Sequence, residues 1–294
     1  MPGSSFHIHP WIKITVMHLT AQKPATDTIR ASFNYVVDTG VPPVRYIDWP
    51  EMEHNAVPPQ YRPHEMTVRN GRPLRDTFKL DVHGFVFTDH HTRVKDFTDE
   101  AERKRVYDPE VQALIQKHSG ASDVVVFDHT IRVSDEAMQK AVNARPTVKG
   151  VHNDYTEASA PRRLREIVGD AEAERRFRKR WAIIQVWRPI RGKVLIDPLG
   201  ICDGRSIPQK GFIRVERRYK DRTGEVYHIA HNAAHEWYWF PEMTRNEALV
   251  FKVFDSDTSK PSRFTAHSAF DDPATPAGAP PRESIETRTF AFFD

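Results

Sequence analysis

The C-terminal part of the chain alternates short apolar stretches with turn residues. Eight such stretches follow one another from residue 181 onward, separated by Pro, Gly, Asn or Asp, with no helical pattern between them. They are WAIIQVW, KVLID, GFIRVERRY, EVYHIAH, EWYWF, ALVFKVFD, RFTAHSAF and SIETRTFAFF. Short strands at this spacing predict a β-sandwich or a double-sheet jelly roll.

The first part of the chain also predicts strands, together with one well-marked helix. Four stretches with turn residues between them indicate a β-rich region: ASFNYVV, VRYIDW, MTVRNGRPL and TFKLDVHGFVFTD. A helix is predicted at about 109–119, with Asp108 as its N-cap, Pro109 at the first helical position and Gly120 beyond its end. The stretch DVVVFDHTIRV predicts a strand, and a short helix is expected near Met138.

Together these elements predict a mainly β protein with flanking helices, folded as a single domain over residues 1–294. The parts that we expect are an N-terminal extension at 1–30, a β-rich flanking region at 31–145, and a jelly-roll core at 146–294 with a helical insertion at about 157–180. The Arg and Glu content of this insertion is typical of an exposed segment rather than of a core.

Composition and charge exclude several classes of protein. Lys and Arg number 43 against 40 Asp and Glu, a formal charge of +3, so a nucleic-acid partner is not favoured. There is no run of 18 apolar residues, which argues against a membrane span, and the first residues lack the pattern of a secretion signal. Cys202 is the only cysteine, which excludes an intrachain disulfide and fits a reducing compartment. We therefore expect a soluble cytoplasmic protein.

The stretch VHNDYT, residues 151–156, carries the first candidate chemistry. Residues two apart in an extended backbone point to the same face, so His152 and Asp154 can converge on one point. With a second imidazole they would form the 2-His-1-carboxylate arrangement of non-heme Fe(II) oxygenases, which leaves positions open for oxygen and a co-substrate. In a jelly roll the second histidine should come from a late strand of the same barrel. The candidates there are His228, His231, His235 and His267.

We favour His267 because of the residues that follow it. Arg282 stands fifteen residues later at the start of the final strand, and Ser284 lies two further along on the same face. The arginine can pair bidentately with a carboxylate and the hydroxyl adds a donor, which would hold the far end of an iron-chelating dicarboxylate. If His235 were the ligand instead, Arg245 would be the nearest equivalent, and two strands would follow with no role.

Two further residues enter the candidate co-substrate site. Gln185 is a polar residue on the apolar strand WAIIQVW, so it must find a partner, either a co-substrate carboxylate or a backbone group. Arg288 lies on the same final strand as Arg282 and is the alternative arginine for holding the co-substrate.

An ordered set of sequence blocks carries a family resemblance. The blocks are VHNDYT, VWRPI and DPLGICD, HEWYWFPEM, FKVFDSD, AHSAFDDP and RESIETR. This set resembles the fungal hydroxylase/desaturase family of Fe(II)/2-oxoglutarate oxygenases. That family takes in gibberellin desaturase-like and endoperoxide-forming enzymes of secondary metabolism, and sequences related to the cephamycin 7α-methoxylase component. The resemblance spans roughly residues 30–294.

The resemblance implies a fold, a metal site and a reaction. It implies a double-stranded β-helix core of the cupin-like jelly-roll kind, with Fe(II) on His152, Asp154 and His267 and with 2-oxoglutarate against Arg282. The implied reaction is oxidative decarboxylation of 2-oxoglutarate by O2 to succinate and CO2, coupled to hydrogen abstraction from a substrate carbon. The implied substrate is an apolar small molecule, either a terpenoid, a polyketide or a peptide-derived metabolite. Hydroxylation, desaturation, ring closure and peroxide insertion all stay open.

Two other functions stay open from the sequence. A zinc-dependent hydrolase or lyase could use the same three ligands, although it would want a third histidine or an added general base. A non-catalytic member of the family, acting as partner of an active oxygenase, would show a lost ligand, and none is evident. We also expect a homodimer, because the β-rich N-terminal third must cover something.

Overall fold

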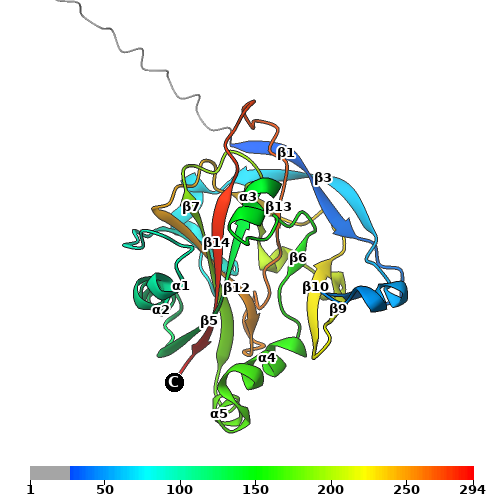
Figure 1. Cartoon of the computed structure of the whole chain (residues 1–294), viewed down its shortest axis with the longest axis vertical. Coiled ribbons are helices and arrows are strands. Elements are labelled where there is room, and N and C mark those ends of the chain that lie inside the picture. The colour runs from blue at the N-terminus through cyan, green and yellow to red at the C-terminus, as the bar shows by residue number, and fades with distance from the viewer. Residues whose placement is uncertain (1–26) are drawn as a thin grey trace, which may run out of the picture.

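Two β-sheets packed face to face form the body of the protein (Figure 1). The computed structural model describes residues 27–294 of the chain. The larger sheet contains β1 (Thr28–Val36), β2 (Val44–Tyr46), β3 (Tyr61–Asn70), β6 (His152–Asn153), β8 (Leu199–Cys202), β9 (Phe212–Arg218), β10 (Thr223–Ile229), β11 (Trp237–Trp239) and β13 (His267–Ala269). The smaller sheet contains β4 (Phe85–Asp89), β5 (Asp123–Val133), β7 (Trp181–Arg191), β12 (Glu247–Asp255) and β14 (Glu283–Phe292).

The order of the strands places the predicted site in the middle of both sheets. The larger sheet runs β1-β3-β11-β8-β13-β6-β10-β9-β2, and the smaller sheet runs β4-β12-β7-β14-β5. A core of apolar side chains from both sheets fills the space between them, including Ile201 and Tyr238 from the larger sheet and Phe251 and Phe290 from the smaller one. The predicted fold class, mainly β with a jelly-roll core, is confirmed.

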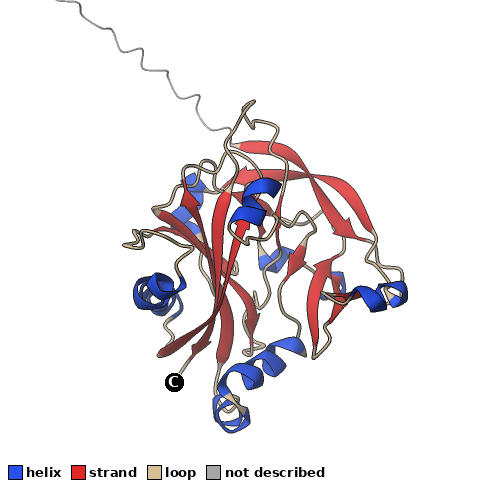
Figure 2. Ribbon diagram, viewed as in Figure 1, coloured by secondary structure: helices blue, strands red, loops and turns tan. Residues whose placement is uncertain are grey.

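Helices flank the sheets on several sides of the molecule (Figure 2). They are α1 (Glu100–Glu102), a π-helical turn (Arg103–Tyr107), α2 (Asp108–Ser119), α3 (Glu136–Ala141), α4 (Ser159–Val168) and α5 (Asp170–Arg176), with 3-10 turns at Pro50–Asn55, Arg72–Thr77, Gly204–Ser206 and Gln209–Gly211. Among the helices of residues 27–294, none is both long enough and apolar enough to cross a membrane.

Strand β7 is apolar at most of its positions because both of its faces are buried. Ile183 and Trp187 point into the core between the sheets, whereas Ile184 and Val186 join a second core that includes Ile115 of helix α2. A strand covered on both faces needs apolar residues at every position rather than at alternate ones. This arrangement holds β7 rigidly in place beside the predicted site.

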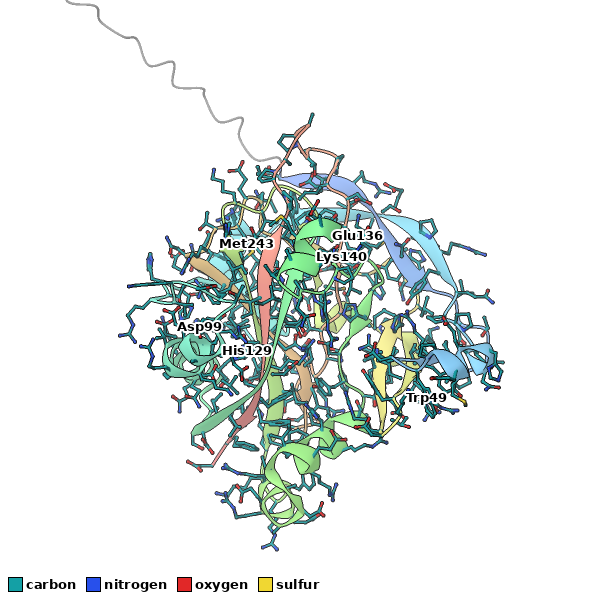
Figure 3. The ribbon with its side chains drawn as sticks, viewed as in Figure 1. Trp49, Asp99, His129, Glu136, Lys140 and Met243 are labelled. Carbon is teal, nitrogen blue, oxygen red and sulfur yellow. The ribbon has the colours of Figure 1, made fainter. Side chains whose placement is uncertain are left out.

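The predicted helix at 109–119 is α2, and it ends as expected at Gly120, which has a left-handed backbone with φ 74°. The prediction of Asp108 as its N-cap is wrong. The π-helical turn joins α2 to α1, so Asp108 already lies inside a helix. Asp99, labelled in Figure 3, caps the combined helix by accepting a hydrogen bond from the backbone N–H of Glu102. The Asp108 carboxylate instead lies 2.8 Å from Nε2 of His129 on β5.

The other sequence predictions have mixed outcomes. The short helix near Met138 is α3, and the helical insertion at about 157–180 is the pair α4 and α5, broken at Gly169. The predicted strand KVLID is wrong, because Lys193 makes only an isolated bridge and Asp197 has a positive φ of 49°, which interrupts an extended chain. Strand β8 begins two residues later. Most of the N-terminal extension expected at 1–30 lies outside the described residues.

Candidate metal centre

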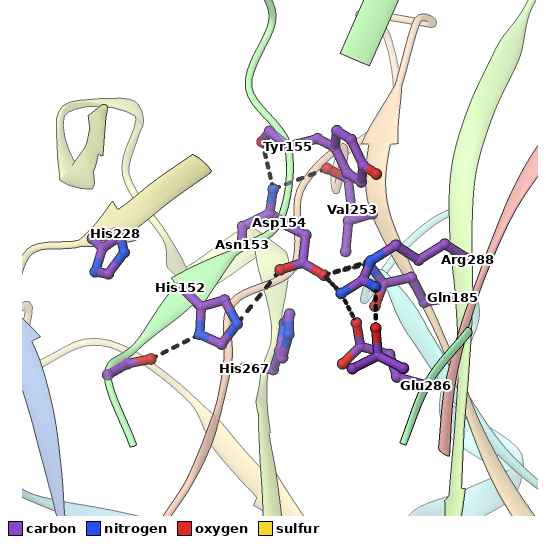
Figure 4. A network of polar contacts seen from close by, with 12 residues as sticks. His152, Asn153, Asp154, Tyr155, Gln185, His228, Val253, His267, Glu286 and Arg288 are labelled. Atoms are coloured by element: carbon purple, nitrogen blue, oxygen red, sulfur yellow. Dashed lines mark hydrogen bonds and ion pairs between the residues drawn. The ribbon is translucent and has the colours of Figure 1, made fainter. Parts of the chain in front are cut away.

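His152 and His267 stand directly opposite each other on neighbouring strands. Strands β6 and β13 are antiparallel, with these two residues as register partners. Cross-strand partners point to the same face of a sheet, and the two ring centroids lie 4.3 Å apart. Asp154 follows β6, and one ligand atom from each of the three residues lies within 4.8 Å of the other two (Figure 4). The structure therefore brings together the three residues that the sequence pattern selects as metal ligands.

Backbone carbonyls determine which ring nitrogen faces the centre. Nδ1 of His152 lies 2.7 Å from the carbonyl oxygen of Gly150, and Nδ1 of His267 lies 3.3 Å from that of Thr265. A carbonyl oxygen only accepts, so each Nδ1 carries the proton and each Nε2 presents a lone pair. Nε2 of His152 lies 3.5 Å from Oδ1 of Asp154, and the buried Nε2 of His267 has no hydrogen-bond partner among the described residues. A metal ion bound between the two Nε2 atoms and Oδ1 of Asp154 would accept a lone pair from each of these three ligand atoms.

Electrostatics favour a cation at this position. Burial, with the neighbouring His267 in support, lowers the pKa of His152 well below its ordinary value. Burial alone would raise the pKa of Asp154, but the charge of Arg288, together with the two neighbouring imidazoles and the hydrogen bond from Gln185, outweighs it and holds the pKa well below the usual range. At neutral pH a carboxylate therefore faces a neutral imidazole. Both are in the protonation states that a divalent metal requires.

Residues of the smaller sheet hold the Asp154 carboxylate in place. Its Oδ2 accepts hydrogen bonds from Nε2 of Gln185 at 2.7 Å and from Nη2 of Arg288 at 2.9 Å, which leaves Oδ1 facing the histidines. Arg288 also pairs with Asp128 at 2.6 Å and with Glu286. Gln185 thus contacts the candidate ligand itself, which is neither of the two partners considered from the sequence. The two charged residues Glu286 and Arg288 in the middle of the last predicted strand were the sequence signal for this network.

Arg282 lies in a very different environment from Arg288. It is 3% exposed, and its guanidinium donates one hydrogen bond, to the carbonyl oxygen of Asp197. No ion pair to a carboxylate forms in the part of the chain that the structure describes, and its Nε and the Oγ of Ser284 are both buried without partners. Burial lowers the pKa of Arg282 to about 10, so the guanidinium remains protonated at neutral pH. Arg282 is therefore a buried cation that makes no direct ion pair among the described residues, although the carboxylates of Asp197 and Glu286 partly offset the cost of its burial.

Two cavities are lined by the candidate metal-ligating residues, one by the two histidines and the other by Asp154. A small cavity of about 10 Å³ is lined by His152, His267, Trp187 and Arg282, so a dicarboxylate could enter only if side chains moved apart. A larger cavity of about 490 Å³ reaches Asp154, Arg288 and Tyr155 on the other side. The centre therefore has one narrow cationic side and one side large enough for a metabolite.

The three other candidate histidines make other contacts. His228 on β10 is also a register partner of His152, with the ring centroids 6.3 Å apart, but its Nδ1 lies 2.8 Å from the hydroxyl of Tyr61. His231 and His235 both pack against the ring of Tyr35, and Nδ1 of His235 lies 3.1 Å from its hydroxyl. None of these three histidines belongs to the cluster of candidate ligand atoms found among residues 27–294.

Comparison with known proteins identifies the family. The family described as "Oxidoreductase/YMDC permease-like domain" matches residues 33–292. The chain is 33% identical over 256 residues to "Hydroxylase/desaturase CTB9" of Cercospora beticola, covering 80% of this chain and 78% of that protein. It is 32% identical over 235 residues to "Alpha-ketoglutarate-dependent dioxygenase phiK" of a fungal species, covering 77% and 84%. The chain belongs to the fungal hydroxylase/desaturase family of Fe(II)/2-oxoglutarate-dependent dioxygenases.

A solved structure supports this membership of the dioxygenase family. The structure titled "iron and alpha-ketoglutarate-dependent endoperoxidase NvfI with different conformation" matches with a TM-score of 0.82 and 27% identity, covering 91% of this chain and 98% of that one. The family predicted from the sequence blocks is confirmed, and so is the enzyme class with its cofactors Fe(II), 2-oxoglutarate and O2. Oxidation of small molecules in secondary metabolism, the activity predicted from the resemblance, is confirmed at the same level.

Proposed function

We propose that this dioxygenase binds Fe(II) through Nε2 of His152, Oδ1 of Asp154 and Nε2 of His267. The observation that carries the proposal is the convergence of two imidazoles and one carboxylate within 4.8 Å, with the His267 nitrogen buried and unpartnered in the described structure. Two neutral nitrogens and one carboxylate oxygen are the donor set of non-heme Fe(II) oxygenases.

The co-substrate site that we propose is the small cavity beside Arg282. Its guanidinium would pair with the far carboxylate of 2-oxoglutarate, and the hydroxyl of Ser284 would add a hydrogen bond. The buried guanidinium of Arg282, which makes no direct ion pair among the described residues, supports this assignment, whereas Arg288 already pairs with three carboxylates. The amide nitrogen of Gln185 donates its hydrogen bond to Asp154. A direct contact between Gln185 and the co-substrate therefore stays a prediction.

In this proposal the chain's own residues bind and orient the reactants. When bound, Fe(II) with 2-oxoglutarate and O2 supplies the oxidising power for removing hydrogen from a substrate carbon. The backbone carbonyls behind His152 and His267 keep both rings turned inward. Arg288 and Gln185 restrain the carboxylate of Asp154, so the donor geometry is fixed before the metal arrives. The ligands are buried, which limits access of water to the centre.

The substrate that we propose is a small secondary metabolite with a largely apolar skeleton, of terpenoid, polyketide or peptide-derived origin. The relatives support a small-molecule substrate, since one is a hydroxylase/desaturase and another an endoperoxidase. The larger cavity, at about 490 Å³, supports a ligand of metabolite size. The homodimer and the cytoplasmic location remain predictions, and light scattering on the purified protein tests the first of them.

Spectroscopy without oxygen tests the metal site. Adding Fe(II) and 2-oxoglutarate to the apoprotein should give a weak visible charge-transfer band. His267→Ala should abolish the band, whereas His235→Ala should keep it. Both histidines are buried, so the second variant controls for lost packing. A band that survives in His267→Ala refutes the ligand assignment. Its absence in the unmodified protein favours the zinc-dependent hydrolase or the non-catalytic partner.

A further inference from the structure

The larger cavity has more arginines than carboxylates along its walls. The carboxylates number four and the arginines six, and the arginines are Arg145, Arg162, Arg163, Arg217, Arg222 and Arg288. Each carboxylate already has an arginine partner: Asp128 and Asp154 pair with Arg288, Glu166 with Arg163, and Glu225 with Arg214 outside the cavity. The walls therefore carry more positive charge than their own carboxylates neutralise.

Four cavity arginines form no ion pair with any carboxylate in residues 27–294. Arg162 donates from Nη1 to the carbonyl oxygen of Thr223 at 2.6 Å, and Arg222 lies over the ring of Tyr219, with its guanidinium carbon 4.0 Å from the ring centroid. Arg145 and Arg217 complete the set. None of these contacts neutralises a guanidinium charge.

The four arginines reach the cavity from three separate parts of the fold. Arg145 lies in the loop before β6, Arg162 on helix α4, and Arg217 and Arg222 on the β9–β10 hairpin. Helix α4 lies against β10 (Figure 1), where Ser159 hydrogen-bonds to the carbonyl oxygen of Glu225. Positive charges converging on one concave surface attract anions more strongly than the same charges spread over a flat surface.

Arginines on the outer side of the same elements behave differently. Arg165, three residues after Arg162 on α4, pairs with Glu174. Arg218, next to Arg217 on β9, pairs with Glu216 at 2.8 Å. Adjacent strand residues point to opposite faces, so β9 presents a neutralised arginine outward and an unpaired one to the cavity. On α4 and β9, therefore, the arginines without a carboxylate partner are those that line the cavity.

We propose that the substrate is an organic anion whose carboxylate groups bind Arg162, Arg217 and Arg222, while its apolar skeleton extends toward Asp154. Tyr155 and Val226 of the same cavity would contact that skeleton. This inference rests on the proposed iron site, since only the iron makes the Asp154 end of the cavity the reacting end. It adds anionic groups to the apolar skeleton proposed above.

Calorimetry on the loaded enzyme tests the proposal. The protein is saturated with Fe(II) and 2-oxoglutarate under nitrogen, so that the co-substrate occupies Arg282, and the charge-transfer band verifies loading. The ligands are two acid and ester pairs, abietic acid with methyl abietate and tricarballylate with its trimethyl ester, together with inorganic pyrophosphate. We expect at least one acid to bind about tenfold or more tightly than its ester, as a charge-assisted hydrogen bond requires.

Variants assign that preference to the cavity. The double variant Arg162→Gln/Arg217→Gln should weaken binding of the acid by about tenfold or more, with the band retained as the sign of an intact centre. The matched control Arg165→Gln/Arg218→Gln removes the outward arginines from the same elements and should leave acid binding unchanged. Acids that bind no better than their esters, binding confined to pyrophosphate, or equal losses in both double variants would overturn the proposal. If the band itself fails to form, it is the iron site that fails.

Discussion

Replacing Arg282 by methionine should separate co-substrate binding from protein stability. Its guanidinium is buried, and among residues 27–294 it forms no ion pair and donates to a single carbonyl. The fall of its pKa from 12.5 to about 10 corresponds to about 3 kcal/mol that burial costs the charged form at neutral pH. Methionine is apolar and of similar length, so Arg282→Met should leave the unfolding free energy of the ligand-free protein unchanged or raise it by up to about 3 kcal/mol.

The same substitution should strongly weaken 2-oxoglutarate binding. Removing one partner of a buried, hydrogen-bonded charge pair costs about 2 to 5 kcal/mol. At about 1.4 kcal/mol per factor of ten, this is a loss in affinity of roughly 30-fold to a few thousand-fold. We expect about 100-fold, since the roughly 3 kcal/mol cost of burying the Arg282 charge is what a carboxylate partner would recover. Urea unfolding of the apoprotein measures the first effect, and the KM for 2-oxoglutarate measures the second.

Arg288→Met is the matched control, and it should give the opposite pattern. Arg288 pairs with Asp128, Asp154 and Glu286, so its removal leaves partly buried carboxylates without a counter-charge. Loss of one partner from a buried pair costs about 3 to 5 kcal/mol of stability. The reasoning is refuted if Arg282→Met destabilises the apoprotein while the KM for 2-oxoglutarate stays unchanged, or if Arg288→Met raises that KM more.

Three further substitutions test other parts of the structure. Gln185→Leu should raise the Fe(II) dissociation constant by about tenfold through loss of its hydrogen bond to Asp154, as measured by iron titration. Lys252→Met breaks the buried pair with Asp255 and should lower the unfolding free energy by about 3 kcal/mol in urea. Burial would raise the pKa of Asp81, but neighbouring cations, Lys252 foremost, hold it well below its usual range. Its stabilisation is present above about pH 4 and lost below, so Asp81→Asn should flatten the fall in stability between about pH 4 and 2.

The strands that the sequence predicted best are those whose burial leaves a local signature. DVVVFDHTIRV matches β5 residue for residue, and WAIIQVW lies within β7, because β-branched and apolar runs suit a strand that is covered on both faces. KVLID is also rich in apolar residues, but it contains no strand. The chain adopts a left-handed backbone at Asp197, and an aspartate marks such a position much less clearly than a glycine does. Side-chain composition therefore predicted packing, and it could not predict a local backbone reversal.

At the candidate metal centre, too, features set by neighbouring residues could be predicted from the sequence, whereas contacts between distant strands could not. The spacing of His152 and Asp154 is local and could be predicted, and His267 was found through the arginine that follows it. The partners of Arg288 could not be found in this way, because Asp128 comes from β5 and reaches it only through the register of β5 with β14. From the sequence Arg282 was favoured for the co-substrate, with Arg288 as the alternative on the same strand. The structure distinguishes them by how far each charge is already neutralised.

Arginines line both cavities, so the proposed sites for 2-oxoglutarate and for the anionic substrate differ mainly in their exposure to solvent. Arg282 is buried, whereas Arg162 and Arg222 are exposed at the rim of the larger cavity. Salt screens exposed charges much more than buried ones, with a Debye length that falls from about 10 Å at 0.1 M to about 3 Å at 1 M. Raising the salt across this range should weaken binding of the carboxylic acid by several-fold and change the KM for 2-oxoglutarate much less. An equal response of both ligands would show that the two anions do not occupy sites of different exposure, and the division of the centre into a buried co-substrate side and an open substrate side would then be wrong.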